Sequence, residues 1–176
     1  MSLNPPVTDS DHTLGPDDAP VTLVEYGDFE CPHCGAAEPI VREVRRVMGS
    51  KLRTVFRNFP LREIHPHAEH AAEAAESAGA QGAYWKMHDL LFDHQNALDD
   101  RDLLTYAAAA GVDPERLRAD LEAGTHEPRV QRDFLSGVRS GVNGTPTFFI
   151  NGERYDGPWD LPQLLAAIAR AAGTDV

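Results

Sequence analysis

The feature that most constrains the fold is a single Cys-Pro-His-Cys segment, which holds the only two cysteines of the chain, Cys31 and Cys34. No other cysteine remains for a structural disulfide, so the 176 residues must be held by an ordinary apolar core. A chain of this length is expected to form one domain. The paired thiols predict redox chemistry, half of a metal site, or an incidental spacing.

The residues around this segment follow a strand–helix–strand pattern. Residues 21–26, Val-Thr-Leu-Val-Glu-Tyr, are typical of a short buried strand, and residues 51–59 predict a second one. Between them, apolar residues recur at the spacing of one helix face, made of Ala37, Ile40, Val41, Val44 and Met48. The cysteines are therefore predicted to lie where a strand passes into a helix.

The C-terminal part of the chain predicts a hairpin followed by a helix. Residues 147–150 form an apolar run, and Asn151 and Gly152 are the residues most favoured in a two-residue hairpin turn. Residues 153–156 would be the partner strand. Asp160 then precedes an amphipathic segment and is expected to cap it.

The segment between these two parts, from about residue 65 to residue 140, has helical periodicity interrupted by glycines. The order is thus a β-α-β half, a helical insertion and a β-β-α half, which belongs to the α/β class. Residues 1–13 lack periodicity and are expected to form a flexible arm. Residues 14–176 are expected to form the single domain.

The charge balance limits the partners. Sixteen basic and 28 acidic residues give a net charge of −12 at pH 7. Such an acidic chain is repelled by nucleic acid and by anionic membranes, and it has no apolar run long enough to insert into a membrane. The first residues lack the features of a signal peptide. On the sequence as given we expect a cytoplasmic protein, or a periplasmic or other extracytoplasmic one if a leader was removed.

A helix N-terminus beside Cys31 has a direct chemical consequence. Unpaired backbone N–H groups and the positive end of the helix dipole both favour a thiolate over a thiol. Cys34, one turn further along, can close a small disulfide ring with Cys31. His33 between them adds a donor or a positive charge. Because a stabilised thiolate favours the reduced form, the disulfide becomes a stronger oxidant.

Two other interpretations of the cysteine pair are open. A zinc site would need further ligands, and His65, His67 and His70 form the nearest histidine cluster. That cluster falls at the start of a predicted helix, and there is no second cysteine pair. An inert pair is the third interpretation. Redox chemistry is favoured over both.

Two acidic residues lie close to the cysteines in the predicted fold. Alternation along Leu23, Glu25 and Gly27 places Glu25 on the sheet face beneath the helix, where it could accept the proton of Cys34. The alternative is an edge glutamate that faces water. Glu38, one turn beyond the cysteines, has either an electrostatic role or an ordinary solvated position.

A second segment of interest is Thr145-Pro146, which follows a glycine-containing loop and directly precedes the strand predicted at 147–150. A proline in this position is a candidate for a cis peptide bond. The sequence has no glycine-rich phosphate loop, and no metal, nucleotide or flavin site is evident in it. We therefore expect no cofactor.

The order of elements and the two motifs resemble a known family. Cys-Pro-His-Cys at residues 31–34, the helical insertion, and Gly-Thr-Pro-Thr-Phe-Phe-Ile-Asn-Gly at residues 144–152 are similar to the DsbA group of thiol–disulfide oxidoreductases. The resemblance covers about residues 14–172. It implies a thioredoxin fold with a helical insertion between the β-α-β and β-β-α halves.

The resemblance also implies roles for the residues of both motifs. Cys31 would be the exposed nucleophile and Cys34 the buried resolving cysteine. Pro32 and His33 would be the dipeptide that tunes the redox potential. Pro146 would be a cis-proline that faces the disulfide.

Further positions are similar to those of the family. The backbone of Thr145 would hydrogen-bond a bound peptide as an added strand, Glu25 would be the buried acid, and Glu38 falls where the DsbA type also carries a glutamate. Thr145 departs from the valine of the best-known oxidases, which bears on the direction of electron flow. Residues 14–26 also look like DsbA-like domains of the cytoplasm, some of them fused behind sodium/proton antiporters.

These observations predict a thiol–disulfide oxidoreductase that exchanges the Cys31–Cys34 disulfide with protein or peptide thiols, more as an oxidant than as a reductant. A separate redox partner would regenerate the pair. The alternative is a redox-sensing or peptide-binding domain that uses the same pair as a switch without turnover. Neither interpretation involves nucleic acid or membrane insertion.

Overall fold

The computed structural model describes residues 1–174 and contains one mixed sheet. Its strands are β1 (His12–Leu14), β2 (Val21–Gly27), β3 (Leu52–Asn58), β4 (Thr147–Ile150) and β5 (Glu153–Tyr155). The strand order is β1-β3-β2-β4-β5, in which β2 pairs parallel with β3 and the other pairs are antiparallel. The crossover between β2 and β3 is the helix that begins at the cysteines.

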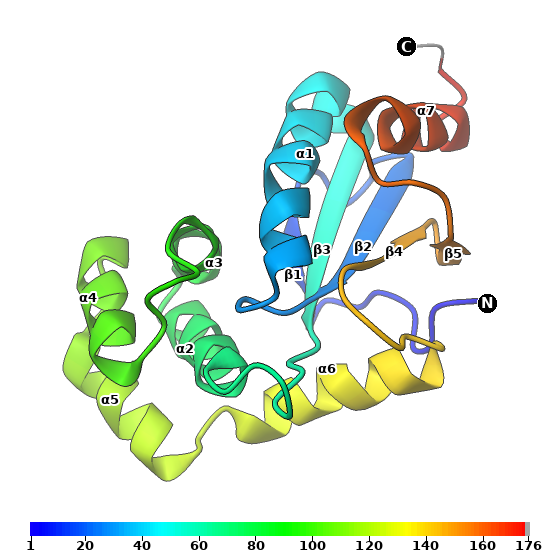
Figure 1. Cartoon of the computed structure of the whole chain (residues 1–176). Coiled ribbons are helices and arrows are strands. Elements are labelled where there is room, and N and C mark those ends of the chain that lie inside the picture. Colours follow the sequence, from blue (N-terminus) through cyan, green and yellow to red (C-terminus); the bar gives the residue numbers. More distant parts are fainter. Residues whose placement is uncertain (175–176) are drawn as a thin grey trace.

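Helices cover both faces of this sheet. Helices α1 (Pro32–Met48) and α7 (Leu161–Ala171) lie side by side on one face, and α6 (Glu127–Arg139) runs across the other (Figure 1). Successive residues of β2 serve the two faces, since Leu23 packs in the cluster with α1 and α7 whereas Val24 packs on the opposite side. Burial on both faces explains why β2 is an apolar run with little polar alternation.

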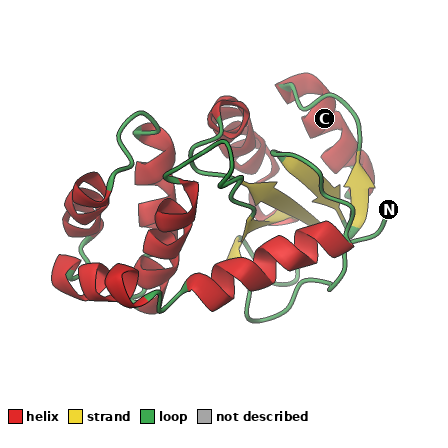
Figure 2. Ribbon diagram, turned by 60° about the horizontal axis from the view of Figure 1, so that its bottom comes forward, coloured by secondary structure: helices red, strands yellow, loops and turns green. Residues whose placement is uncertain are grey.

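The helical insertion has a core of its own that continues into the sheet. It consists of α2 (Ala68–Ala80), α3 (Tyr84–Asp93), α4 (Asp100–Ala110), α5 (Pro114–Ala123) and α6. Figure 2 shows these helices as a group beside the sheet. Helix α6 extends from this group and runs back along the sheet. Phe29, Cys31, Cys34 and Phe56 belong to the same buried cluster as the alanine-rich face of α2. The insertion therefore forms one wall of the region that contains the cysteines.

Local sequence signals set several of the element ends. Asp99, Asp113 and Asp160 accept hydrogen bonds from the first turns of α4, α5 and α7. Asn151 and Gly152 both have positive φ, 49° and 83°, as the predicted two-residue turn between β4 and β5 requires. The predicted β-α-β half, helical insertion and β-β-α half are all present. In the part of the chain that the structure describes, no helix is long and apolar enough to span a membrane.

The N-terminal segment differs from the flexible arm expected for residues 1–13. Residues 12–14 form β1 against β3, and Leu3 is only 9% exposed. The physical reason is Arg57 of β3, whose buried guanidinium requires acceptors. The segment supplies the carboxylate of Asp11, 2.8 Å from Arg57 Nε, and the carbonyl oxygens of Pro5 and Pro6. A buried charge that is fully hydrogen-bonded fixes the segment in place.

This ion pair gives a stability prediction. Asp11→Ala leaves the Arg57 guanidinium buried without its carboxylate, so we expect the free energy of unfolding to fall by roughly 3–5 kcal/mol. The matched control is Asp17→Ala, because the Asp17 side chain is 92% exposed and lies 3.9 Å from Arg53; it should leave stability unchanged. Urea unfolding measures both. Equal effects of the two substitutions would contradict the assigned role of the N-terminal segment.

Candidate active site

Cys31 occupies the N-cap position of α1, with extended backbone angles (φ −71°, ψ 121°) and Pro32 as the first helical residue. Proline suits this position because its missing N–H would have no helical partner. The side chain of Cys31 caps no backbone N–H group. Its sulfur instead lies where the N–H groups of His33 and Cys34 favour a negative charge.

Several hydrogen bonds lower the pKa of the Cys31 thiol to about 5. The largest contribution comes from the Cys34 thiol, and burial opposes it. The Thr145 side chain and the two backbone N–H groups add further stabilisation of the thiolate. In this structure the Thr145 hydroxyl is buried and has no hydrogen-bond partner, so it is free to donate to a charged sulfur. Cys31 is therefore a thiolate at neutral pH.

The Thr145–Pro146 peptide bond is cis, and its segment directly faces Cys31. The Cys31 sulfur lies 3.5 Å from the carbonyl oxygen of Thr145, to which the group donates only when it is protonated. Cys31 is only 4% exposed in this structure, in which both cysteines are free thiols. The expectation of an exposed nucleophile is therefore wrong here. The sulfur is covered because the loop before β4 and the helical insertion both pack over the start of α1.

Cys34 has the opposite environment. It is fully buried, and its sulfur accepts a hydrogen bond from the backbone N–H of Asp28 over 3.5 Å. Burial, the hydrogen bond with Cys31 and the nearby Glu25 carboxylate raise the pKa of the Cys34 thiol well above its ordinary value. The two cysteines are thus a thiolate and a thiol, one helical turn apart.

Glu25 lies beneath the start of α1 on β2 and is 4% exposed, so it does not face water. Burial, followed by the charges of Glu38 and Cys31, raises the pKa of the Glu25 carboxyl well above its ordinary value. Its Oε1 atom has no hydrogen-bond partner in the described structure. A cavity of about 10 Å³ borders Glu25, Glu38 and His88, which is just enough room for one water molecule.

Glu38 is also buried, at 3% exposed, rather than solvated. Its carboxylate accepts from Arg42 Nε over 2.8 Å, and Arg42 also contacts Asp93 and Asp89. Glu38, His88 and Asp89 are the one cluster of three potential metal-ligating side chains among residues 1–174. The Arg42 guanidinium already occupies the space next to two of these carboxylates, so the cluster is an ion-pair network.

The histidines considered as zinc ligands do not converge on the cysteines. His65 Nδ1 lies 2.7 Å from Asp28, and His70 Nδ1 lies 2.7 Å from Asp100 on α4. His67 is exposed at the end of the loop before α2. His33 is exposed on the first turn of α1 beside Pro32. The described cysteines therefore have each other, and not a histidine set, as their nearest chemical partners.

Two residues of the site were not expected from the sequence. Asp28 is buried and its carboxylate accepts from the backbone N–H groups of Glu30 and Leu61 as well as from His65. Gln95, in the loop after α3, donates to the carbonyl oxygens of Phe29 and Cys31 over 2.8 and 3.0 Å. Both fix the loop that presents Cys31, and each joins segments too far apart in sequence for a local pattern to reveal.

Comparison with known families and proteins agrees with this geometry. A family model described as thioredoxin matches residues 7–170. The sodium/proton antiporter NhaA 3 of Salinispora tropica is 49% identical over 163 residues, which cover 93% of this chain and 25% of that protein. The chain thus spans about a quarter of the length of the curated relatives it matches, and the transport activity in their names describes those longer proteins.

Solved structures are similar over nearly the whole chain. A thioredoxin-like oxidoreductase from Silicibacter pomeroyi has a TM-score of 0.82 at 28% identity, covering 96% of this chain and 95% of that one. Alpha-DsbA1 from Wolbachia pipientis has a TM-score of 0.82 at 20% identity, covering 95% and 93%. The expected thioredoxin fold with a DsbA-like helical insertion is confirmed.

The environment of Cys31 predicts its reactivity. In the reduced protein, alkylation of Cys31 should be half-maximal near pH 5 and lost as the pH falls further, because the thiolate is the nucleophile. Cys34→Ala removes the largest stabilising hydrogen bond and should move this midpoint upward. Thr145→Val removes a smaller one and should move it less. Mass spectrometry after timed alkylation gives the profiles, and a wild-type midpoint above pH 8 would contradict this electrostatic assignment.

Proposed function

The chain belongs to the thioredoxin family, and from this premise we propose that it is a thiol–disulfide oxidoreductase that oxidises protein or peptide thiols. One observation carries the proposal: a thiolate at Cys31 with a pKa of about 5 lies beside the buried Cys34, whose thiol pKa is raised. A pair in which one sulfur is a good leaving group and the other is shielded is suited to disulfide exchange.

The exchange follows from the two environments. A substrate thiolate attacks the Cys31 sulfur of the Cys31–Cys34 disulfide, which forms a mixed disulfide and releases Cys34 as a thiolate. A second substrate thiolate then attacks the substrate sulfur of the mixed disulfide. The substrate leaves with a new disulfide, and the protein keeps the two electrons as a Cys31 thiolate and a Cys34 thiol. The low pKa of Cys31 makes it the better leaving group in the second step.

Glu25 is suited to supply the proton that Cys34 needs. Burial raises the pKa of its carboxyl group, which favours the protonated form that can donate to a Cys34 thiolate. Two features support proton transfer to and from the Glu25 carboxyl group. Its Oε1 atom has no hydrogen-bond partner, and the adjacent cavity has room for one water molecule. When a redox partner regenerates the disulfide, Glu25 would accept the Cys34 proton again.

Thr145 and Pro146 would bind the substrate backbone. The Thr145 carbonyl faces the Cys31 sulfur, at the place where a peptide cysteine must come to react. A peptide laid antiparallel to this segment would add a short strand next to the reactive sulfur. Pro32 and His33, exposed on the first turn of α1, would contact the substrate and tune the potential.

The direction of electron flow rests on thiolate stabilisation. Everything that lowers the pKa of Cys31 stabilises the reduced protein and makes its disulfide a stronger oxidant. Thr145, where the best-known oxidases carry valine, adds to this effect here because its side chain also favours the thiolate. An oxidant of protein thiols is useful in an oxidising compartment, which favours the extracytoplasmic alternative over the cytoplasmic one. A separate redox partner would reoxidise the pair, and no cofactor takes part.

A trapping experiment separates an enzyme from a switch. In Cys34→Ser the Cys31 thiolate can still attack a protein disulfide, forming a mixed disulfide and releasing the other protein sulfur as a thiolate. Cys34 cannot resolve this mixed disulfide, so we expect covalent complexes with many disulfide-containing proteins, which come apart on reduction. The control Cys31→Ser should trap none, because the remaining Cys34 is completely buried and the raised pKa of its thiol disfavours the reactive thiolate. Diagonal gel electrophoresis followed by mass spectrometry identifies the captured proteins. One captured partner, or none, would favour a redox sensor or peptide-binding domain and contradict the proposal.

A further inference from the structure

A buried carboxylate and a histidine form a pair beside the cysteines that the exchange described above does not use. Asp28 follows β2 directly, and its side chain is completely buried. Its Oδ2 atom lies 2.7 Å from His65 Nδ1, and His65 retains 16% side-chain exposure. An aspartate in this position holds the imidazole in one orientation and leaves Nε2 directed away from it.

Asp28 also binds both ends of the cysteine segment through its backbone. Its N–H donates to the Cys34 sulfur over 3.5 Å, and its carbonyl accepts from the N–H of Cys31 over 3.1 Å. His65 is therefore connected through one residue to both cysteines. Any charge that appears on Cys31 acts on the His65 imidazole across this short, largely buried connection.

His65 also borders the groove next to the reactive cysteine. The groove has a volume of about 460 Å³, and its walls include Pro32 on α1 and Gln95 in the loop after α3. His65 thus lies on the open side of the site, where it can exchange protons with water, while Asp28 lies on the closed side. The buried Asp28 carboxylate thus contacts the titratable His65 ring, which in turn reaches solvent through the groove.

We propose that Asp28 and His65 form a redox-linked proton site, in which His65 binds a proton when the Cys31–Cys34 disulfide is reduced and its positive charge then stabilises the Cys31 thiolate. The inference rests on the proposed exchange reaction and deepens it. His65 acts on the Cys31 thiolate only through its positive charge, and Asp28 orients the His65 ring. No bond forms between His65 and the substrate.

The balance of protons and electrons explains the need for such a site. A substrate dithiol that becomes a disulfide gives up two electrons and two protons. Both electrons go to the cysteine pair, but the pair takes up only one of the two protons. Cys34 receives it through Glu25, which is then reprotonated, and Cys31 remains a thiolate. The second proton binds His65, so the site gains no net charge on reduction. Without it, the new thiolate would lie near the buried Asp28 with no cation to offset either group.

The charged groups that face His65 favour the same outcome. Burial opposes protonation, but the hydrogen bond that His65 donates to Asp28 and the charges of Asp28, Cys31 and Glu30 together raise the His65 pKa. Across the groove, the start of α4 presents Asp99 and Asp102, and the adjacent His67 lines the same groove. The acidic groups outnumber the one neighbouring histidine. The positive charge on His65 is present below its pKa and is lost as the pH rises through it.

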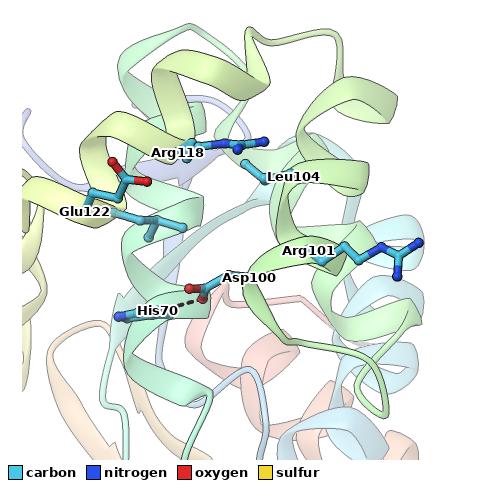
Figure 3. A pocket seen from close by; sticks show the side chains of 7 residues that line it. His70, Asp100, Arg101, Leu104, Arg118 and Glu122 are labelled. Atoms are coloured by element: carbon cyan, nitrogen blue, oxygen red, sulfur yellow. Dashed lines mark hydrogen bonds and ion pairs between the residues drawn. The ribbon is translucent and has the colours of Figure 1, made fainter.

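The structure contains a matched pair that lacks this connection. His70 on α2 lies 2.7 Å from Asp100 on α4, in the same Nδ1-to-carboxylate arrangement (Figure 3). This pair borders a pocket of about 420 Å³ whose lining comes from α2, α4 and α5, with no residue of the cysteine segment. The His70 pKa is raised by Asp100 and neighbouring glutamates. His70 is therefore the internal control, a histidine whose pKa should not depend on the redox state of the cysteines.

The test measures proton binding in both redox states. In wild-type protein we expect nuclear magnetic resonance titration to give a higher His65 pKa in the reduced form than in the oxidised form, by roughly 0.5 to 1. His70 should titrate identically in both. Linkage requires a reciprocal effect: His65→Asn, which retains a donor for Asp28 but holds no charge, should raise the Cys31 pKa by the same amount.

A second pair of variants separates charge from structure. His65→Arg keeps a permanent positive charge and a donor for the Asp28 carboxylate, so it should retain the low Cys31 pKa and lose the histidine titration. His70→Asn should leave the Cys31 pKa unchanged. The inference is overturned by a His65 pKa that ignores the redox state, by an unchanged Cys31 pKa in His65→Asn, or by His65→Arg behaving like His65→Asn. These measurements are equilibrium titrations, so their outcome does not depend on whether the protein turns over protein substrates.

Discussion

The stabilisation of a negative charge on the Cys31 sulfur is the interaction on which the rest of the site depends. Removing a thiolate from bulk water is costly, and burial alone would keep Cys31 protonated. The structure offsets this cost with donors from three sources: the first turn of α1, the Cys34 thiol and the Thr145 side chain. The contact between Cys31 and Thr145 joins residues 114 positions apart, so the fold of the whole sheet is required to assemble it.

The surroundings of the cysteines keep charges in balance at short range. Glu38 has Arg42 and Asp28 has His65, each within about 3 Å, whereas no cation of residues 1–174 pairs with Glu25, whose pKa is raised so that its neutral form is favoured. Glu25 is therefore the carboxyl group beside the cysteines that is suited to carry a proton. The helical insertion completes this environment because its apolar face closes over Phe29 and both cysteines, which lowers the local dielectric and strengthens every one of these interactions.

The sequence predicted the features that depend on local periodicity or on short motifs. The order of strands and helices, the hairpin turn at residues 151–152 and the position of the cysteines at the start of α1 follow from such signals. Alternation along β2 also places Glu25 under α1. These predictions succeeded because backbone geometry alone fixes which residues share a face.

Features that depend on partners far apart in sequence were missed or wrong. The segment 1–13 was expected to be flexible because nothing in it shows that Arg57 of β3 requires its oxygens. Asp28 and His65 are 37 positions apart, and no local sequence pattern around either residue indicates that they interact. The exposure of Cys31 was overestimated because the loop that covers it arrives from the other end of the chain.

The reduction potential of the Cys31–Cys34 pair tests the central claim most directly. The protein is equilibrated against glutathione buffers, and alkylation of the free thiols reports the reduced fraction. We expect a potential well above the roughly −270 mV of thioredoxin, toward the roughly −120 mV that marks a strong disulfide donor. A potential near or below about −270 mV would show that the thiolate at Cys31 does not make this pair an oxidant, and would contradict the account.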